Sequence, residues 1–147
     1  MEKRLWTGFV LCLLAIVSMT AKPKEEKAYK EGAFIYGMAI SLTDSTVFVT
    51  EIQNVGKASI NAKTGFLEGR TMYSEQLRSY LERIGMGANM ACAVSFHEKS
   101  HKLQKKYQKV TAKYGKKEGV TLKTIKSAEF TFEPVAPLSN NMESNQE

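Results

Sequence analysis

The sequence predicts an α+β protein with a small antiparallel or mixed sheet, in the order β-β-α-β-α-β, and two amphipathic helices packed on one face of that sheet. The sheet is indicated by residues 34–41 and 90–96, which alternate bulky and small side chains with the period of two that a strand imposes. The helices are indicated by residues 73–84 and 103–114, where apolar side chains recur three and four positions apart.

The domain is predicted to begin with a hairpin. The bulky face of its first strand consists of Phe34, Tyr36, Met38 and Ile40. A turn is expected at residues 43–45, Thr-Asp-Ser, because these side chains hydrogen-bond to nearby backbone. Residues 46–52 are rich in β-branched side chains and predict the second strand. Residues 53–65 hold two glycines and show no clear pattern, so no element is predicted there.

Two helices follow, each with a predicted end. The apolar stripe of the first helix consists of Tyr73, Leu77, Tyr80, Leu81 and Ile84. Gly85 follows that stripe, where a glycine can take the left-handed conformation that ends a helix. The second helix is expected to start with a capping box, Ser95 as N-cap and Glu98 three residues later, and to end at Gly115. Its apolar stripe consists of Leu103, Tyr107, Val110 and Tyr114.

Two segments leave alternatives open. Residues 88–96 are rich in Ala and Met, so they could extend the second helix upstream instead of forming a strand. Residues 120–125 and 129–132 are expected to be one or two last strands, although residues 120–125 would also suit a helical turn.

The first 21 residues have the three parts of a secretory signal peptide. Lys3 and Arg4 form a basic head, residues 5–17 form an apolar run, and residues 18–21 are mostly small. Because a membrane-spanning helix needs about 20 apolar residues, the shorter run predicts cleavage and export, to the periplasm or the medium, rather than an uncleaved anchor. We therefore expect no transmembrane segment in the mature chain.

The remaining chain is expected to hold one folded domain. Residues 22–32 are charged and nearly free of apolar side chains, which predicts a flexible leader, and residues 134–147 are polar with two prolines, which predicts a disordered tail. A single α+β domain then covers residues 33–133. Cys92 is the only cysteine after the signal peptide, so the domain cannot close an internal disulfide and must be stabilised by its core.

One motif suggests catalysis. His97-Glu98-Lys99-Ser100-His101 matches H-E-x-x-H, in which two histidines one helical turn apart bind Zn²⁺ and the glutamate acts as general base on a metal-bound water. On this interpretation the chain would be a small zinc-dependent hydrolase with His97 and His101 as ligands and Glu98 as the base. However, the chain has no third histidine, Glu98 already serves the predicted helix cap, and both histidines point away from the predicted apolar stripe. We therefore expect a protein without a catalytic site, cofactor or metal.

The second helix also carries an uneven charge distribution. Between residues 99 and 117 there are eight lysines and no acidic residue. Four of them lie on one flank, at positions i, i+4, i+7 and i+11: Lys102, Lys106, Lys109 and Lys113. Since like charges at this spacing repel one another, solubility alone does not require the pattern, and it suggests attraction to an anionic partner; a merely solvated face is the alternative. Because the chain is expected outside the cytoplasm, the expected partner is anionic lipid, glycan or an acidic protein surface, and no nucleic acid.

Three segments of the predicted domain carry a similarity to other sequences. They are YGMAISLTDSTVFVTEIQ, FLEGRTMYSEQLRSYLE and ACAVSFHEKSHKLQKKYQKV. Over about residues 34–114 they resemble a group of small exported proteins of unknown function from Bacteroidetes-type bacteria. The resemblance implies a periplasmic or secreted location and no assigned activity.

Taken together, these features predict a non-catalytic envelope or secreted binding module that contacts an anionic partner through the lysines of its second helix. The zinc-dependent hydrolase is the main alternative. A third possibility is a subunit that pairs with a partner through an exposed sheet edge.

Overall fold

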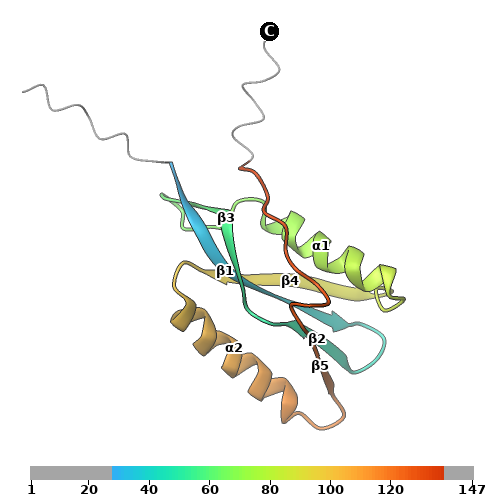
Figure 1. Cartoon of the computed structure of the whole chain (residues 1–147). Coiled ribbons are helices and arrows are strands. Elements are labelled where there is room, and N and C mark those ends of the chain that lie inside the picture. Colours follow the sequence, from blue (N-terminus) through green and yellow to red (C-terminus); the bar gives the residue numbers. More distant parts are fainter. Residues whose placement is uncertain (1–27, 138–147) are drawn as a thin grey trace, which may run out of the picture.

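The computed structural model describes residues 28–137, and within them it confirms an α+β domain with a mixed five-stranded sheet and two helices (Figure 1). The elements are β1 (Tyr29–Ser41), β2 (Thr46–Thr50), β3 (Gln53–Asn61), α1 (Arg70–Arg83), β4 (Met90–His97), α2 (Ser100–Gly115) and β5 (Thr121–Ile125). The predicted signal peptide at 1–21, residues 22–27 of the predicted leader and residues 138–147 of the predicted tail lie outside the described residues. Neither of the two described helices has the length and apolar character needed to span a membrane.

β1 is the central strand of the sheet. β2 and β3 follow one another along one side of β1, and β4 pairs with its other side, all antiparallel. β5 extends the sheet beyond β2 in the parallel direction. β2 and β3 are separated only by Glu51 and Ile52, and at this interruption the Thr50 hydroxyl accepts a hydrogen bond of 2.9 Å from the Gly37 N–H. The order across the sheet is therefore β4, then β1, then β2 with β3, then β5.

The predicted hairpin of β1 and β2 is confirmed, and β3 is an addition to the predicted elements. Val55, Ala58 and Ile60 of β3 are buried, so the alternation of buried and exposed residues breaks after Val55. The break lies where the register with β1 shifts, next to Gly32, whose φ is 92°. At a bulge the alternation of a strand shifts by one residue, so the buried apolar positions change from odd-numbered to even-numbered residues. The period of two that would reveal a strand is therefore lost from the sequence.

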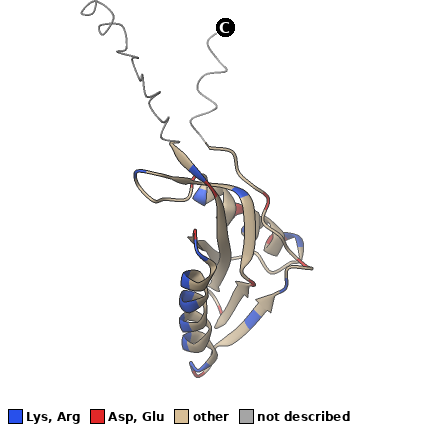
Figure 2. Ribbon diagram, turned by 60° about the vertical axis from the view of Figure 1, so that its left-hand side comes forward, with Lys and Arg blue, Asp and Glu red and all other residues tan. Residues whose placement is uncertain are grey.

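The two helices lie on opposite faces of the sheet, which differs from the predicted packing on one face (Figures 1 and 2). Ile35 and Ala39 belong to the core on the α1 side, whereas Tyr36 packs against α2. The physical reason is the register of β1 and β4, which sets Tyr36 opposite Ser95. This register turns the bulky faces of the two strands to opposite sides of the sheet, so that bulky residues of one strand lie beside small residues of the other.

The path of the chain leads to the same arrangement. β3, β4 and β5 all run in one direction, opposite to β1. β3–α1–β4 and β4–α2–β5 are therefore crossover connections, and they cross the sheet in opposite directions. Since crossovers between parallel strands share one hand almost without exception, their two helices must lie on opposite faces.

The larger core lies between the sheet and α1. Tyr73, Leu77 and Leu81 of the predicted apolar stripe are fully buried there. The rest of this face is covered by residues 129–135, which we call the C-terminal strap. Its buried side chains are Phe130, Phe132 and Val135.

The C-terminal strap is not the strand predicted at residues 129–132. It does not join the sheet, and the side chain of Gln53 takes the place of a neighbouring strand. The Gln53 amide donates to the Phe130 carbonyl and accepts from the Phe132 N–H, both at 2.8 Å. A buried side-chain amide thus satisfies the backbone groups that a strand ladder would otherwise pair.

Further along, two residues of α1 hold the strap. The Gln76 amide donates to the Glu133 carbonyl at 2.9 Å and accepts from the Glu133 N–H at 2.8 Å. The Tyr73 hydroxyl accepts a hydrogen bond of 3.0 Å from the Val135 N–H. The ordered domain therefore reaches into the predicted tail.

The ordered domain also starts earlier than predicted. β1 begins at Tyr29, so residues 29–32 of the predicted leader belong to the sheet. The predicted range 33–133 is thus exceeded at both ends, because the first strand continues past the bulge and the strap continues to Val135.

The smaller core lies between the sheet and α2. Its buried members are Tyr36, Val49 and Leu103. The rings of Tyr36 and Tyr107 meet edge to face, with centroids 5.2 Å apart. Leu103 is the one fully buried residue of α2, and the other members of the predicted stripe are half-buried.

Candidate binding face on α2

α2 begins after a short bend that joins it to β4. β4 ends at His97 and α2 starts at Ser100, with Lys99 as an N-cap in extended conformation that makes no side-chain cap bond. The predicted capping box is wrong, because Ser95 lies within β4. The alternative in which residues 88–96 extend the helix is wrong for the same reason.

The H-E-x-x-H motif is divided between two elements. His97 is the last residue of β4 and His101 is the second residue of α2, so the two imidazoles are not one turn apart on a helix. His97 Nδ1 accepts a hydrogen bond of 2.9 Å from the Lys99 N–H, and Glu98 forms an ion pair of 3.2 Å with Lys30. Among residues 28–137 no three His, Cys, Asp or Glu side chains are grouped as metal ligands. The residues present therefore do not form the zinc site that the motif suggests.

The surroundings of His97 disfavour a positive charge. Desolvation lowers the pKa of its imidazole, and Lys102 lowers that pKa further, whereas Glu98 acts in the opposite direction. Lys106 also contributes to the lowering. Lys102 and Lys106 of α2 therefore lie close enough to the end of β4 to act on this imidazole, with Glu98 as the opposing charge.

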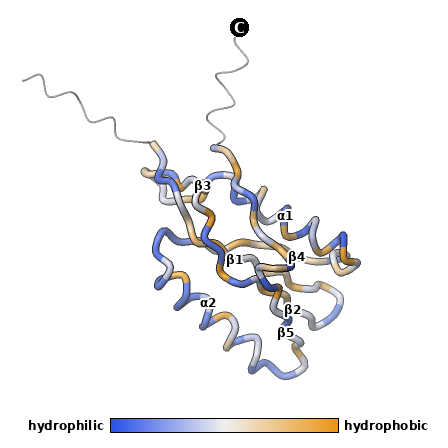
Figure 3. The backbone as a smooth tube through the Cα atoms, viewed as in Figure 1, coloured by the Kyte–Doolittle hydropathy of each residue, from blue (hydrophilic) through white to orange (hydrophobic). Residues whose placement is uncertain are grey.

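The structure places the four predicted lysines on one exposed face of α2. We call this the lysine face, and it consists of Lys102, Lys106, Lys109 and Lys113. At a rise of 1.5 Å per residue, the first and last of them are about 16 Å apart along the helix axis. Figure 2 shows positively charged positions following one another down α2. The tube in Figure 3 is mostly hydrophilic along this helix, with isolated apolar positions.

The lysine face has no carboxylate partner within the described part of the chain. The ion pairs found there are Lys30 with Glu98 and Arg78 with Glu75, and neither involves a lysine of α2. The first turn of α2 also contains no acidic residue. Apart from the contact of Lys113 with the Tyr114 ring, at 5.5 Å from its centroid, nothing offsets the repulsion among these positive charges, and an external anion would stabilise them.

The sheet beside the lysine face is partly uncovered. This opening was not predicted, because both helices were expected over the bulky face of the sheet. Met38 and Ile40 point to the α2 side but are only half-buried, and Leu42 is 72% exposed. The register places Ala93 beside Met38 and Ala91 beside Ile40, and both alanines are exposed. We call these five residues the uncovered sheet face.

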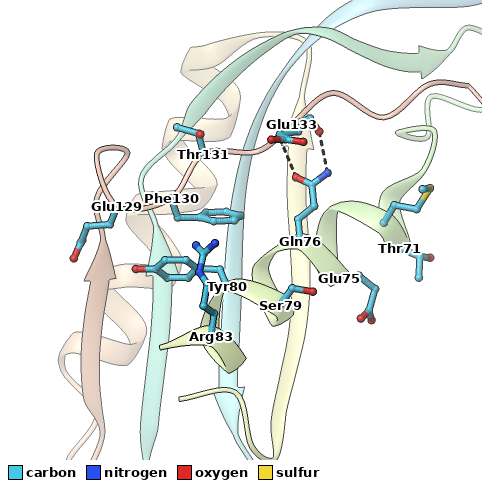
Figure 4. A pocket seen from close by; sticks show the side chains of 11 residues that line it. Thr71, Glu75, Gln76, Ser79, Tyr80, Arg83, Glu129, Phe130, Thr131 and Glu133 are labelled. Atoms are coloured by element: carbon cyan, nitrogen blue, oxygen red, sulfur yellow. Dashed lines mark hydrogen bonds between the residues drawn. The ribbon is translucent and has the colours of Figure 1, made fainter. Parts of the chain in front are cut away.

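A groove of about 890 Å³ lies on the other side of the molecule, between α1 and the strap (Figure 4). The Arg83 guanidinium lies 5.6 Å from the centroid of the Tyr80 ring, and that ring lies 5.1 Å from the ring of Phe130. Figure 4 shows Gln76 bonded to the backbone of Glu133 at the opposite end. The central groups of this groove are thus engaged with one another, and they hold the strap on α1.

Comparison with known proteins adds no functional assignment. No family model, no curated protein and no solved structure matches this chain. The resemblance to small exported proteins gains no support from them. The function is therefore inferred from the geometry and charge of α2 and of the sheet beside it.

Proposed function

We propose that this protein is an exported, non-catalytic binding module whose lysine face binds an anionic partner. The observation that carries the proposal is a row of four exposed lysines along one flank of a helix that contains no acidic residue. The zinc-dependent hydrolase is not proposed, because the two histidines of its motif lie on different elements.

The lysine face is unfavourable for the isolated protein. Like charges one turn apart destabilise a helix by about 0.2–0.5 kcal/mol per pair. An anionic surface more than offsets this repulsion between lysines, since each lysine near such a surface contributes about 1 kcal/mol of attraction. The row is convex and extends along a helix, so it suits an extended anionic surface rather than a small ligand, which is usually bound in a concave site.

The direct test is a binding titration at increasing salt. We would measure binding of the purified protein to vesicles of phosphatidylglycerol and to a sulfated polysaccharide. A variant with Lys102, Lys106, Lys109 and Lys113 all changed to Gln should bind more weakly by a factor of about 10² to 10³. Binding of the unchanged protein should weaken as salt screens the charges.

A second variant controls for net charge. Lys57, Lys63, Lys123 and Lys126 are exposed and lie outside α2, so their change to Gln removes the same charge elsewhere. This control should retain most of the binding. Binding that is insensitive to salt, or that is equally weak in both variants, would contradict a specific role of the lysine face.

Export is tested separately. It rests on the basic head and apolar run of the first 21 residues. Cell fractionation followed by N-terminal sequencing should find the protein outside the cytoplasm with its N-terminus near Lys22. A cytoplasmic protein that retains Met1 would contradict it.

A further inference from the structure

We infer that the uncovered sheet face and the lysine face together form a docking site for an acidic amphipathic helix of a partner protein. The inference rests on the proposed function and narrows its anionic partner to a protein. The apolar side of the partner helix would lie on Met38, Ile40, Ala91 and Ala93, and its carboxylates would face the lysines of α2.

The two faces of the sheet differ in how they are covered. A helix is about 10 Å across and strands are about 4.8 Å apart, so one helix covers roughly two strands. Four strands lie abreast, as β4, β1, β2 and β5. On the α1 side the strap fills the space beside the helix with Phe130 and Phe132. On the α2 side no other described segment takes that place, and β4 with the end of β1 is left open.

The floor of this open half is apolar and flat. Ala91 and Ala93 are the smallest side chains that still offer apolar surface, so a partner backbone can approach the strand closely. Met38 and Ile40 extend the apolar surface along β1, and Leu42 continues it just beyond the end of that strand. Four residue steps separate Met38 from Leu42, which at 3.3 Å each makes an apolar floor about 13 Å long. A helix of about nine residues, two and a half turns, has that length.

The lysine face forms a wall along this floor. α2 crosses from β4 to β5 with Leu103 turned to the sheet, and a right-handed crossover of this kind sets the flank of Lys102 and Lys106 on the β4 side of the helix. The same two lysines lower the pKa of His97 at the end of β4. Tyr107 lies on the other side of Leu103 and packs on Tyr36. The cationic flank therefore faces β4 and the neutral flank faces away from it. An apolar floor beside a cationic wall fits a partner with an apolar side and an acidic side.

Two other modes of binding fit the surface less well. A strand added to the free edge of β4 would need its backbone carbonyls, but Arg70 donates to the Val94 carbonyl at 3.1 Å and Arg78 to the Met90 carbonyl at 3.4 Å. These arginines protect the edge against strand addition. A flat bilayer would meet the protruding α2 before it reached the floor, so the floor would contribute nothing to its binding.

The test uses a synthetic 18-residue peptide with leucines at helical spacing along one side and glutamates on both flanks. Two control peptides replace every Glu by Lys or every Leu by Ser. The protein is compared with a floor variant, Ala91→Gln with Ala93→Gln, and with the variant that lacks the lysine face. Both alanines are exposed, so the floor variant keeps the core intact.

We expect the unchanged protein to bind the acidic peptide at least about tenfold more tightly than either control peptide. The floor variant should lose about tenfold or more of this affinity and keep its binding to anionic vesicles. In NMR spectra the methyl signals of Met38, Ala91 and Ala93 should shift on titration. Those of Met72 and Met86, which are exposed elsewhere, should not.

Each contrary result identifies which proposal fails. If the acidic peptide does not bind, or if the floor variant binds it as well as the unchanged protein does, the docking site is wrong. The proposed function then stands as long as vesicle binding still requires the lysine face, and a membrane becomes the favoured partner. If removal of the lysine face changes neither peptide nor vesicle binding, both proposals are wrong.

Discussion

At the scale of single residues, Gly37 sets how closely α1 can approach the sheet. A Cβ at this position would lie 2.7 Å from Leu77 Cδ2 and 3.1 Å from Phe132 Cζ. Both neighbours are buried, and one comes from the helix and the other from the strap. Because Gly37 has no side chain, Leu77 and Phe132 can both pack directly against the backbone of β1 at this position. The sequence shows a small residue here, but only the structure shows which side chains require it.

We predict that Gly37→Ala destabilises the protein by about 1–2 kcal/mol, because an overpacked core forces its side chains from their preferred positions. Gly37→Val should cost more. Gly56→Ala is the matched control, since Gly56 also lies in a strand but has nothing within 4 Å of its added Cβ. That control should be neutral or slightly stabilising. Urea unfolding measures both, and equal effects would show that the contact with Leu77 is not limiting.

At the scale of elements, the strap shows that two glutamines can replace a strand. The amides of Gln53 and Gln76 each make two hydrogen bonds to the strap backbone. In each case the amide nitrogen donates to a carbonyl and the amide oxygen accepts from an N–H. The two differ in burial, because Gln53 is 9% exposed and the bonds of Gln76 lie at the surface. Water can replace a bond at the surface but not one in the core. The two glutamines therefore test how much of the strap's attachment depends on desolvation.

We predict that Gln53→Ala costs about 2–4 kcal/mol of unfolding free energy, since it leaves the Phe130 carbonyl and the Phe132 N–H buried without partners. Gln76→Ala removes the same kind of amide and should cost less than about 1 kcal/mol. Thermal unfolding gives both values, and amide exchange of Phe132 should accelerate only in the first variant. Similar costs at the two positions would mean that the strap is held by its phenylalanines alone.

The elements that the sequence predicts are those whose periodicity is local. α1 carries its stripe of Tyr73, Leu77 and Leu81 into the core, and β4 alternates as predicted because it pairs along its whole length with β1. β3 was not predicted, because the bulge near Gly32 shifts its register with β1 and interrupts its alternation. The capping box at Ser95 fails because that hydroxyl belongs to a strand whose pairing extends to His97.

The candidate site is likewise only half predictable. The lysine face follows from helical spacing alone, since a charged face needs no knowledge of the rest of the fold. The uncovered sheet face does not, because it depends on the register between β1 and β4 and on the helix that covers each side. The division of the H-E-x-x-H motif is also hidden in the sequence, because it depends on where β4 ends.

At the scale of the whole molecule, the charges of the two sides differ. α1 carries both signs and forms an ion pair on its own surface between Arg78 and Glu75, whereas α2 carries lysine alone among its charged residues. Protein folding does not require such an arrangement, since mixed charges on a helix are at least as stable. The asymmetry can therefore be tested as a property of the free protein, before any partner is known.

If the lysine face serves binding at the expense of stability, its removal should stabilise the protein. The face contains three pairs at i, i+3 or i, i+4, each costing about 0.2–0.5 kcal/mol, and Lys and Gln have similar helix propensities. Changing Lys102, Lys106, Lys109 and Lys113 to Gln should therefore raise the free energy of unfolding by about 1 kcal/mol at low salt. At 1 M salt, where the screening length is about 3 Å, the gain should disappear. The control that changes Lys57, Lys63, Lys123 and Lys126 lacks these helical pairs and should gain less. A loss of stability on removing the lysine face would show that α2 needs its lysines to fold, and their spacing would then no longer argue for a partner.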